Sequence, residues 1–166
     1  MKKLLLTMAV LVSCYALYAQ EFEVPKSFNP KTADDYAPYE ADVIKSVDWL
    51  MSMPYVLERQ KRDQVNAFLL KWITGSPNVH IEIKPEIVTF MGGTPDLLMI
   101  FMGGWSKYSL ESKKFDDKEG GSLAGLHAVI DFYQNNKKSL PKDKNVEKYI
   151  KMKDHGELEA YVKSNC

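Results

Sequence analysis

The spacing of apolar residues is the feature that most restricts the fold of this chain. From Ala41 onward these residues recur every three or four positions, and proline or glycine separates the runs. In the first run Val43, Val47 and Leu50 follow the spacing i, i+4, i+7, and Pro54 ends it. Such spacing places apolar side chains on one face of a helix, and helices of this kind bury that face by packing together. The sequence therefore predicts an all-α fold.

Seven helices are expected, mostly in neighbouring pairs joined by short breaks. Their approximate ranges are 41–53, 55–74, 85–91, 94–108, 122–133, 146–150 and 154–162. This arrangement favours a single domain of packed αα-hairpins over residues 42–166. Helical-repeat arrays also consist of helix pairs, but the chain lacks a period of about 34 residues and the tetratricopeptide pattern. No family resemblance follows.

Local signals predict where several helices begin and end. Gly75 suits the position after a helix end where φ is positive, and Ser122 suits an N-cap. Residues 154–157 resemble a capping box with Glu157 at its third helical position. The charged segment 111–121 ends in two glycines and is expected to form a loop.

Two helices carry further expectations about their faces. Gly103 and Gly104 fall inside the helix at 94–108, where each glycine costs about 1 kcal/mol relative to alanine. We therefore expect another backbone to approach closely there, or the helix to bend. Charged residues near the start of the helix at 55–74 are expected on its outer face: Glu58, Arg59, Lys61, Arg62 and Asp63.

Two segments outside the helices are expected to be extended. Residues 20–41 contain three prolines, which predicts an extended lead-in, and residues 78–84 alternate apolar with polar side chains as a half-buried strand does. The only alternating partner for 78–84 is 21–24, so a short β ladder and an extended connector both remain open. Five side chains are expected to anchor the lead-in to the body: Phe22, Val24, Phe28, Tyr36 and Tyr39.

The first nineteen residues have the layout of a secretory signal peptide: Lys2 and Lys3, then an uncharged apolar stretch, then small residues. Two processing sites compete. Cleavage between Ala19 and Gln20 would release a periplasmic or secreted protein, whereas a bacterial lipobox ending at Cys14 would leave a lipid-anchored one. We favour cleavage after Ala19 because the apolar stretch continues past Cys14. No later segment approaches the roughly 20 apolar residues that a transmembrane helix needs.

Charge and cysteine content restrict the partners and the chemistry of the exported chain. Without residues 1–19 it carries 20 basic and 22 acidic residues, a formal charge of −2 that argues against nucleic acid as a partner. Its one cysteine, Cys166, cannot form an internal disulfide, so the fold depends on its core. We expect Cys166 to be a tail thiol, with pairing between molecules as the alternative.

The sequence contains no recognised catalytic, cofactor or metal motif. Its three histidines, His80, His127 and His155, lack the spacing of a helical zinc site, and no phosphate-binding glycine loop or nucleophile elbow is present. His80 and Glu82 lie on one face of the 78–84 segment and are the best candidates for an enzyme of the hydrolase type. We interpret them as a polar surface edge, and we expect no cofactor.

The aromatic residues suggest binding more than catalysis. Trp105 and Tyr108 lie one helical turn apart beside Gly103-Gly104, and they are the candidates for a groove in which a peptide or sugar stacks. The leading hypothesis is therefore an exported, non-catalytic helical protein of the bacterial envelope that binds a protein or a small ligand. The alternatives are a hydrolase-type enzyme and a lipid-anchored assembly factor.

Overall fold

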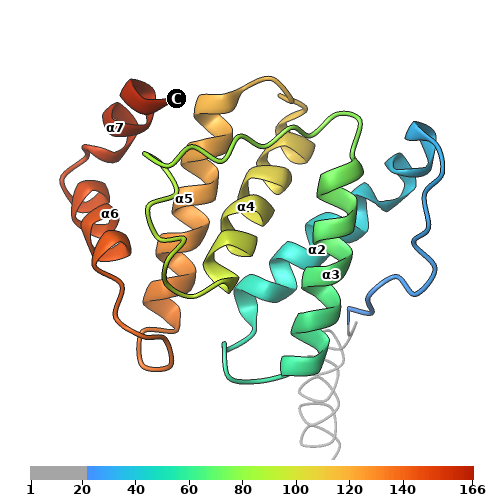
Figure 1. Ribbon diagram of the computed structural model, residues 1–166, viewed down its shortest axis with the longest axis horizontal. Helices are drawn as coiled ribbons and strands as arrows, with labels where there is room; N and C mark the ends of the chain where they lie inside the picture. Colours follow the sequence, from blue (N-terminus) through green and yellow to red (C-terminus); the bar gives the residue numbers. More distant parts are fainter. Residues whose placement is uncertain (1–21) are drawn as a thin grey trace, which may run out of the picture.

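Six α-helices make up most of the part of the chain that the structure describes, residues 22–166 of a computed structural model (Figure 1). The elements are the 3₁₀ turns η2 (Ala33–Asp35) and η3 (Ala37–Tyr39), followed by α2 (Glu40–Ser52), α3 (Arg59–Gly75), α4 (Asp96–Ser112), α5 (Lys118–Asn135), α6 (Lys144–Asp154) and α7 (Leu158–Asn165). These residues contain no strand and pack as one unit, so the predicted all-α single domain is confirmed. None of the helices within 22–166 is long and apolar enough to cross a membrane.

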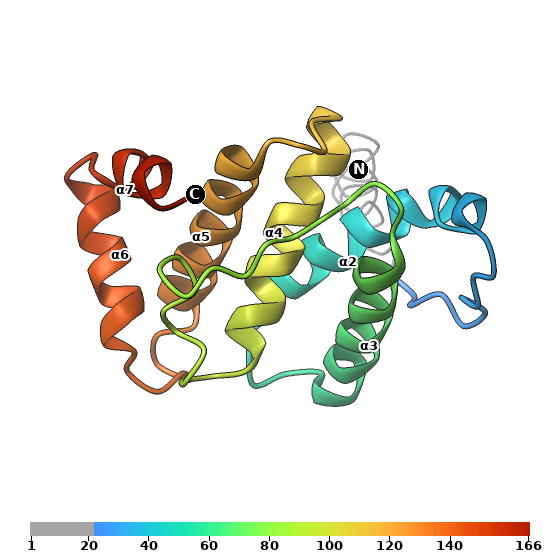
Figure 2. The same ribbon diagram turned by 45° about the horizontal axis from the view of Figure 1, so that its top comes forward.

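Helices α4 and α5 lie side by side at the centre of the molecule (Figures 1 and 2). Their backbones come unusually close, because a Cβ atom on Gly104 would lie 2.7 Å from the Cβ of Ala128 and 3.0 Å from the carbonyl oxygen of Ala124. A Cβ atom on Gly125 would likewise lie 2.8 Å from the carbonyl oxygen of Phe101. The expected close approach of another backbone is therefore confirmed at Gly104, whereas a Cβ on Gly103 would meet the side chain of Val47 at 3.1 Å.

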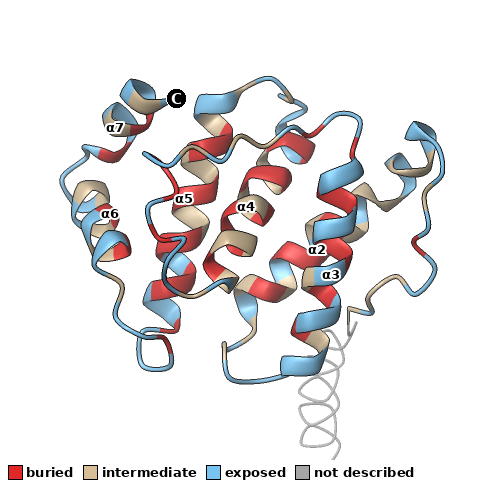
Figure 3. Ribbon diagram, in the orientation of Figure 1, coloured by how far each residue is buried: buried red, intermediate tan, exposed pale blue. Residues whose placement is uncertain are grey.

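The remaining helices cover the two sides of this central pair. Helices α2 and α3 pack on the α4 side, while α6 and α7 pack on the α5 side, and buried residues concentrate on the faces between them (Figure 3). Aromatic side chains supply much of the buried volume. The largest fully buried ones are Trp72, Trp105, Tyr133, Tyr149, Phe90, Phe101 and Phe132.

The long connection between α3 and α4, residues 76–95, crosses the central helices and reaches α6 and α7 (Figure 1). The predicted helix at 85–91 is wrong, because this stretch forms turns. In a helix its carbonyl groups would accept hydrogen bonds from backbone N–H groups of the next turn, but here they accept hydrogen bonds from side chains of α6 and α7. The hydroxyl of Tyr149 donates to the carbonyl of Ile87 at 2.8 Å, and the hydroxyl of Tyr161 donates to the carbonyl of Glu86 at 2.7 Å. The side-chain amide of Asn145 donates to the carbonyl of Thr89 at 2.8 Å.

The segment 78–84 belongs to this connection and does not form a strand. It is the extended connector that the sequence left as the other alternative. Val79 is buried and Ile81 is half-buried, whereas Ile83 is 37% exposed. The apolar side chains therefore hold the connector to the helices without a pairing strand.

The predicted extended lead-in at 20–41 is wrong for its second half, where residues 33–35 and 37–39 form 3₁₀ turns and α2 begins at Glu40. Residues 22–32, called the lead-in below, run without helical structure along the outside of α3 and are anchored as expected. Phe28 is buried in an aromatic cluster, with ring centroids 4.8 Å from Tyr39, 5.4 Å from Phe68 and 5.6 Å from Tyr36. Phe22 and Val24 are partly buried against the same core. The aromatic contacts explain how a segment rich in proline stays on the surface of α3.

Two predicted helix ends are wrong because a glycine serves side-chain packing. Gly75 is the last residue of α3 and lacks a positive φ, but a Cβ there would lie 1.9 Å from the hydroxyl oxygen of Tyr36. Helix α5 begins at Lys118, four residues before Ser122, and its glycines leave room for the indole of Trp105. Only the middle of the predicted 111–121 loop, residues 113–117, is therefore non-helical.

Two further expectations near helix ends are also wrong. Residues 154–157 end α6 rather than begin α7: Gly156 has φ +71°, and the N–H of Glu157 donates to the carbonyl of Met152 at 2.8 Å, as in a Schellman motif. Arg62, expected on the outer face of α3, is only 3% exposed. Its guanidinium reaches back to the carbonyl of Met53 at 3.1 Å, in line with the N-terminal lean of helical side chains.

Candidate functional site

Trp105 and Tyr108 serve packing roles in α4. Trp105 is 1% exposed, and its indole nitrogen is buried without a hydrogen-bond partner among the described residues. Tyr108 is half-buried and donates its hydroxyl to Asp117 at 2.6 Å. Neither residue lines the two hollows described below. A ligand groove at these residues stays a prediction. Trp105 has almost no exposed surface on which a ligand could stack.

Asp117 joins Tyr108 to the start of α5. Its carboxylate accepts the Tyr108 hydroxyl and the N–H of Gly120, and these two bonds lower the pKa of Asp117. A carboxylate at this position caps the helix and opposes the positive end of its dipole.

Replacing Asp117 with alanine is expected to lower the free energy of unfolding by about 1 kcal/mol at neutral pH, since an N-cap is lost. Because the folded state depresses the pKa of Asp117, its contribution is present above the unfolded pKa and disappears as pH falls through the folded one. Urea titrations at neutral and strongly acidic pH measure both effects. An equal deficit for Asp117→Ala at both pH values would contradict this account.

His80 and Glu82 do not form a catalytic arrangement in the described chain. His80 is exposed, and the carboxylate of Glu82 contacts the ammonium groups of Lys118 and, at 3.9 Å, Lys84. The bond from Lys118 lowers the pKa of Glu82, which opposes a role as a proton donor near neutral pH. Within residues 22–166 no three His, Cys, Asp or Glu side chains gather closely enough to hold a metal ion.

The other candidate residues lie apart from one another. His127 is half-buried on α5, where burial first and then Lys153 lower its pKa, while His155 is exposed at the end of α6. The thiol of Cys166 lies 3.2 Å from the hydroxyl oxygen of Ser122, so the last residue is placed against α5. The processing sites at Cys14, Ala19 and Gln20 fall outside the described residues.

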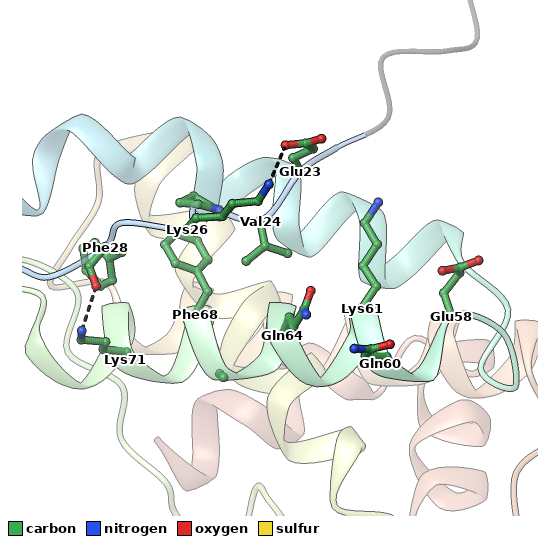
Figure 4. A pocket seen from close by; sticks show the side chains of 12 residues that line it. Glu23, Val24, Lys26, Phe28, Glu58, Gln60, Lys61, Gln64, Phe68 and Lys71 are labelled. Atoms are coloured by element: carbon green, nitrogen blue, oxygen red, sulfur yellow. Dashed lines mark hydrogen bonds and ion pairs between the residues drawn. The ribbon is translucent and has the colours of Figure 1, made fainter.

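The best candidate site is a groove between the lead-in and α3, with a volume of about 880 Å³ (Figure 4). This volume lies within the roughly 300–1,000 Å³ of typical ligand sites. A second hollow of about 220 Å³, beside Trp72, falls below that range. The lead-in wall of the groove comprises Glu23, Val24, Pro25, Lys26 and Phe28, and the α3 wall comprises Glu58, Gln60, Lys61, Gln64, Ala67, Phe68 and Lys71.

The sequence folds into this groove because Phe28 anchors only one end of the lead-in wall. The ring of Phe28 packs on Phe68, and the ammonium of Lys71 donates to the Phe28 carbonyl at 2.8 Å. Toward Glu58 the two walls diverge, and Figure 4 shows Gln60 and Gln64 on α3 facing the space under the lead-in.

Apolar and polar groups are separated within the groove. Val24, Ala67 and Phe68 provide an apolar floor, whereas amide and charged side chains surround it. The charged groups are of both signs, with Lys26 lying 3.8 Å from Glu23 at the exposed edge. This arrangement suits an elongated ligand with both apolar and polar parts.

The sequence points to two parts of this groove without joining them. It predicts Phe28 as an anchor of the lead-in, and it places Phe68 on the inner stripe of its helix. Gln60, Gln64 and Ala67 carry no motif, because an exposed amide or alanine is ordinary on a helix surface. The groove depends on which helix the lead-in crosses, and local spacing does not encode that.

Comparisons with protein-family models, curated proteins and solved structures found no match for this chain.

Proposed function

We propose that this chain is an exported, non-catalytic binding protein of the bacterial envelope, and that its ligand binds in the groove between the lead-in and α3. The groove itself is the observation that supports this most directly, since its volume and its apolar floor with a polar rim resemble those of ligand sites. The signal-like segment 1–19 supports export. Release after Ala19 is preferred over a lipid anchor at Cys14, and the intact mass of the mature protein distinguishes the two.

A thermal-shift screen with peptides, oligosaccharides and fatty acids tests the groove. A probe that binds there, present at a hundredfold excess over its dissociation constant, stabilises the protein by about 2.7 kcal/mol. For a domain of this size we expect Tm to rise by roughly 5–10 °C.

Two tryptophan variants of α3 locate the binding. Ala67→Trp fills the groove floor, while Asp63→Trp places the same side chain on an exposed residue that does not line the groove. We expect Ala67→Trp to abolish the Tm shift and Asp63→Trp to keep it. If no probe shifts Tm, or if Ala67→Trp responds like the unaltered protein, the groove is not the binding site.

A further inference from the structure

The first described residues of the lead-in, 22–24, have a backbone without a hydrogen-bond partner in the described chain. Residues 26 and 27 form a turn, and the carbonyl of Phe28 accepts from Lys71, but Glu23 and Val24 make no backbone hydrogen bond to any other described residue. Glu23 is exposed and Val24 is half-buried, and both residues line the groove. An unpaired, extended backbone of this kind offers an edge to which another extended chain can add.

The facing wall on α3 complements such an edge. The side-chain amides of Gln60 and Gln64 make no hydrogen bond to any other described residue, and both line the groove. An amide carries both a donor and an acceptor, which is what the main chain of a peptide requires. Val24 points from the lead-in toward α3, and together with Ala67 and Phe68 it forms an apolar floor suited to one apolar side chain.

Other ligand classes fit these walls less well. A sugar normally stacks on an exposed aromatic face, but Phe28 and Phe68 are 8% and 6% exposed. A fatty acyl chain needs a continuous apolar channel, whereas charged side chains of both signs and two amides line much of this groove. The lead-in of a second copy is a weaker occupant, because its Phe28 is already buried in its own body.

Resting on the proposed function, we infer that the ligand is an extended segment of a partner protein. This segment pairs with the N–H and C=O of Val24, because successive residues of an extended chain direct these groups to opposite edges, and it places one apolar side chain on the floor between Val24 and Phe68. Its backbone binds by hydrogen bonds, and the alternation of its side chains sets specificity, as in other cases of strand addition.

Two substitutions at Val24 isolate the backbone contribution. Val24→Pro removes the N–H that pairing needs, while Val24→Ala shortens the side chain and keeps the N–H. That N–H has no partner in the described chain, so Val24→Pro should unfold at about the same urea concentration as Val24→Ala. The probes are short capped peptides in which valine alternates with threonine, with lysine at each end for solubility.

We expect these peptides to bind the unaltered protein. Val24→Ala should weaken binding modestly, because it trims the apolar floor. Val24→Pro should bind about tenfold more weakly than Val24→Ala, the value of one net hydrogen bond. N-methylation of the peptide along one edge should remove binding, while methylation along the other edge should not. Equal binding by both Val24 variants, together with tolerance of N-methylation on either edge, would overturn the pairing.

The remaining outcomes separate this inference from the proposed function. If a sugar or fatty acid gives the groove-dependent Tm shift and no peptide does, the peptide assignment falls while the binding function stands. If no probe gives the shift, both fall. A dimer that Val24→Pro dissociates would assign the wall to a second copy and overturn the partner segment.

Discussion

Alanine in place of Gly104 or Gly125 is expected to lower the free energy of unfolding by about 2 kcal/mol, although alanine is the better helix former by about 1 kcal/mol. The added Cβ on Gly104 would lie 3.0 Å from the carbonyl oxygen of Ala124, and that on Gly125 would lie 2.8 Å from the carbonyl oxygen of Phe101. These neighbours are backbone atoms, which cannot move aside as the end of a flexible side chain can. The helices must separate, and the buried contacts between them loosen.

Gly92 supplies the matched control for this prediction. It lies in a turn of the α3–α4 connection and lacks a positive φ, and a Cβ atom added there would meet no atom within 4 Å. Gly92→Ala is therefore expected to change the free energy of unfolding by no more than about 0.5 kcal/mol. Urea unfolding followed by circular dichroism compares the three variants. If Gly104→Ala were as stable as Gly92→Ala, the two central helices could not be as close as described.

The same glycines show what apolar spacing can and cannot predict. The helical face of α4 is a local property, and so the sequence predicts that helix and the need for a close neighbour at Gly104. It does not identify α5 as that neighbour. Gly75 shows the opposite case: the pattern suggests a positive φ, but the glycine makes room for Tyr36, which lies far away in the sequence. A glycine in the sequence indicates that a side chain does not fit at that position, but it does not identify the neighbouring group.

Hydrogen bonds and grooves between distant segments limit prediction in a similar way. At 85–91 the local preference for a helix loses to donors on α6 and α7, whose positions follow from the packed fold. Residues from two distant segments, 23–28 and 58–71, line the groove, and neither segment carries a binding motif by itself. Trp105 is the more prominent sequence candidate because it is a large aromatic residue, and that same property favours its burial.

Replacing Arg62 with alanine is expected to lower the free energy of unfolding by about 3–4 kcal/mol. The side chain is 3% exposed, and its guanidinium lies 5.6 Å from the ring centroids of both Tyr55 and Phe132 and 5.9 Å from that of Trp49. Truncation leaves a cavity between these rings and removes the donor to the carbonyl of Met53.

The charge of Arg62, however, is poorly compensated. Its Nε and Nη1 atoms are buried without a hydrogen-bond partner in the described chain, and no carboxylate there lies within ion-pair distance of it. Burial lowers the pKa of Arg62 and the charge of Asp96 acts against that shift, so desolvation outweighs attraction. Removing a buried, poorly paired charge while keeping its volume is often neutral or stabilising.

Arg62→Met therefore separates packing from charge. Methionine fills most of the space between the rings with a flexible apolar side chain and brings no buried donor. We expect it to unfold within about 1 kcal/mol of the unaltered protein, because the desolvation penalty that it removes offsets the lost contacts with the rings and with Met53. Urea titrations of both variants give the comparison. A methionine variant as unstable as Arg62→Ala would contradict this expectation. It would show that the contacts of the cation with the three rings and with the Met53 carbonyl stabilise the junction of α2, α3 and α5 by more than the desolvation of the guanidinium costs.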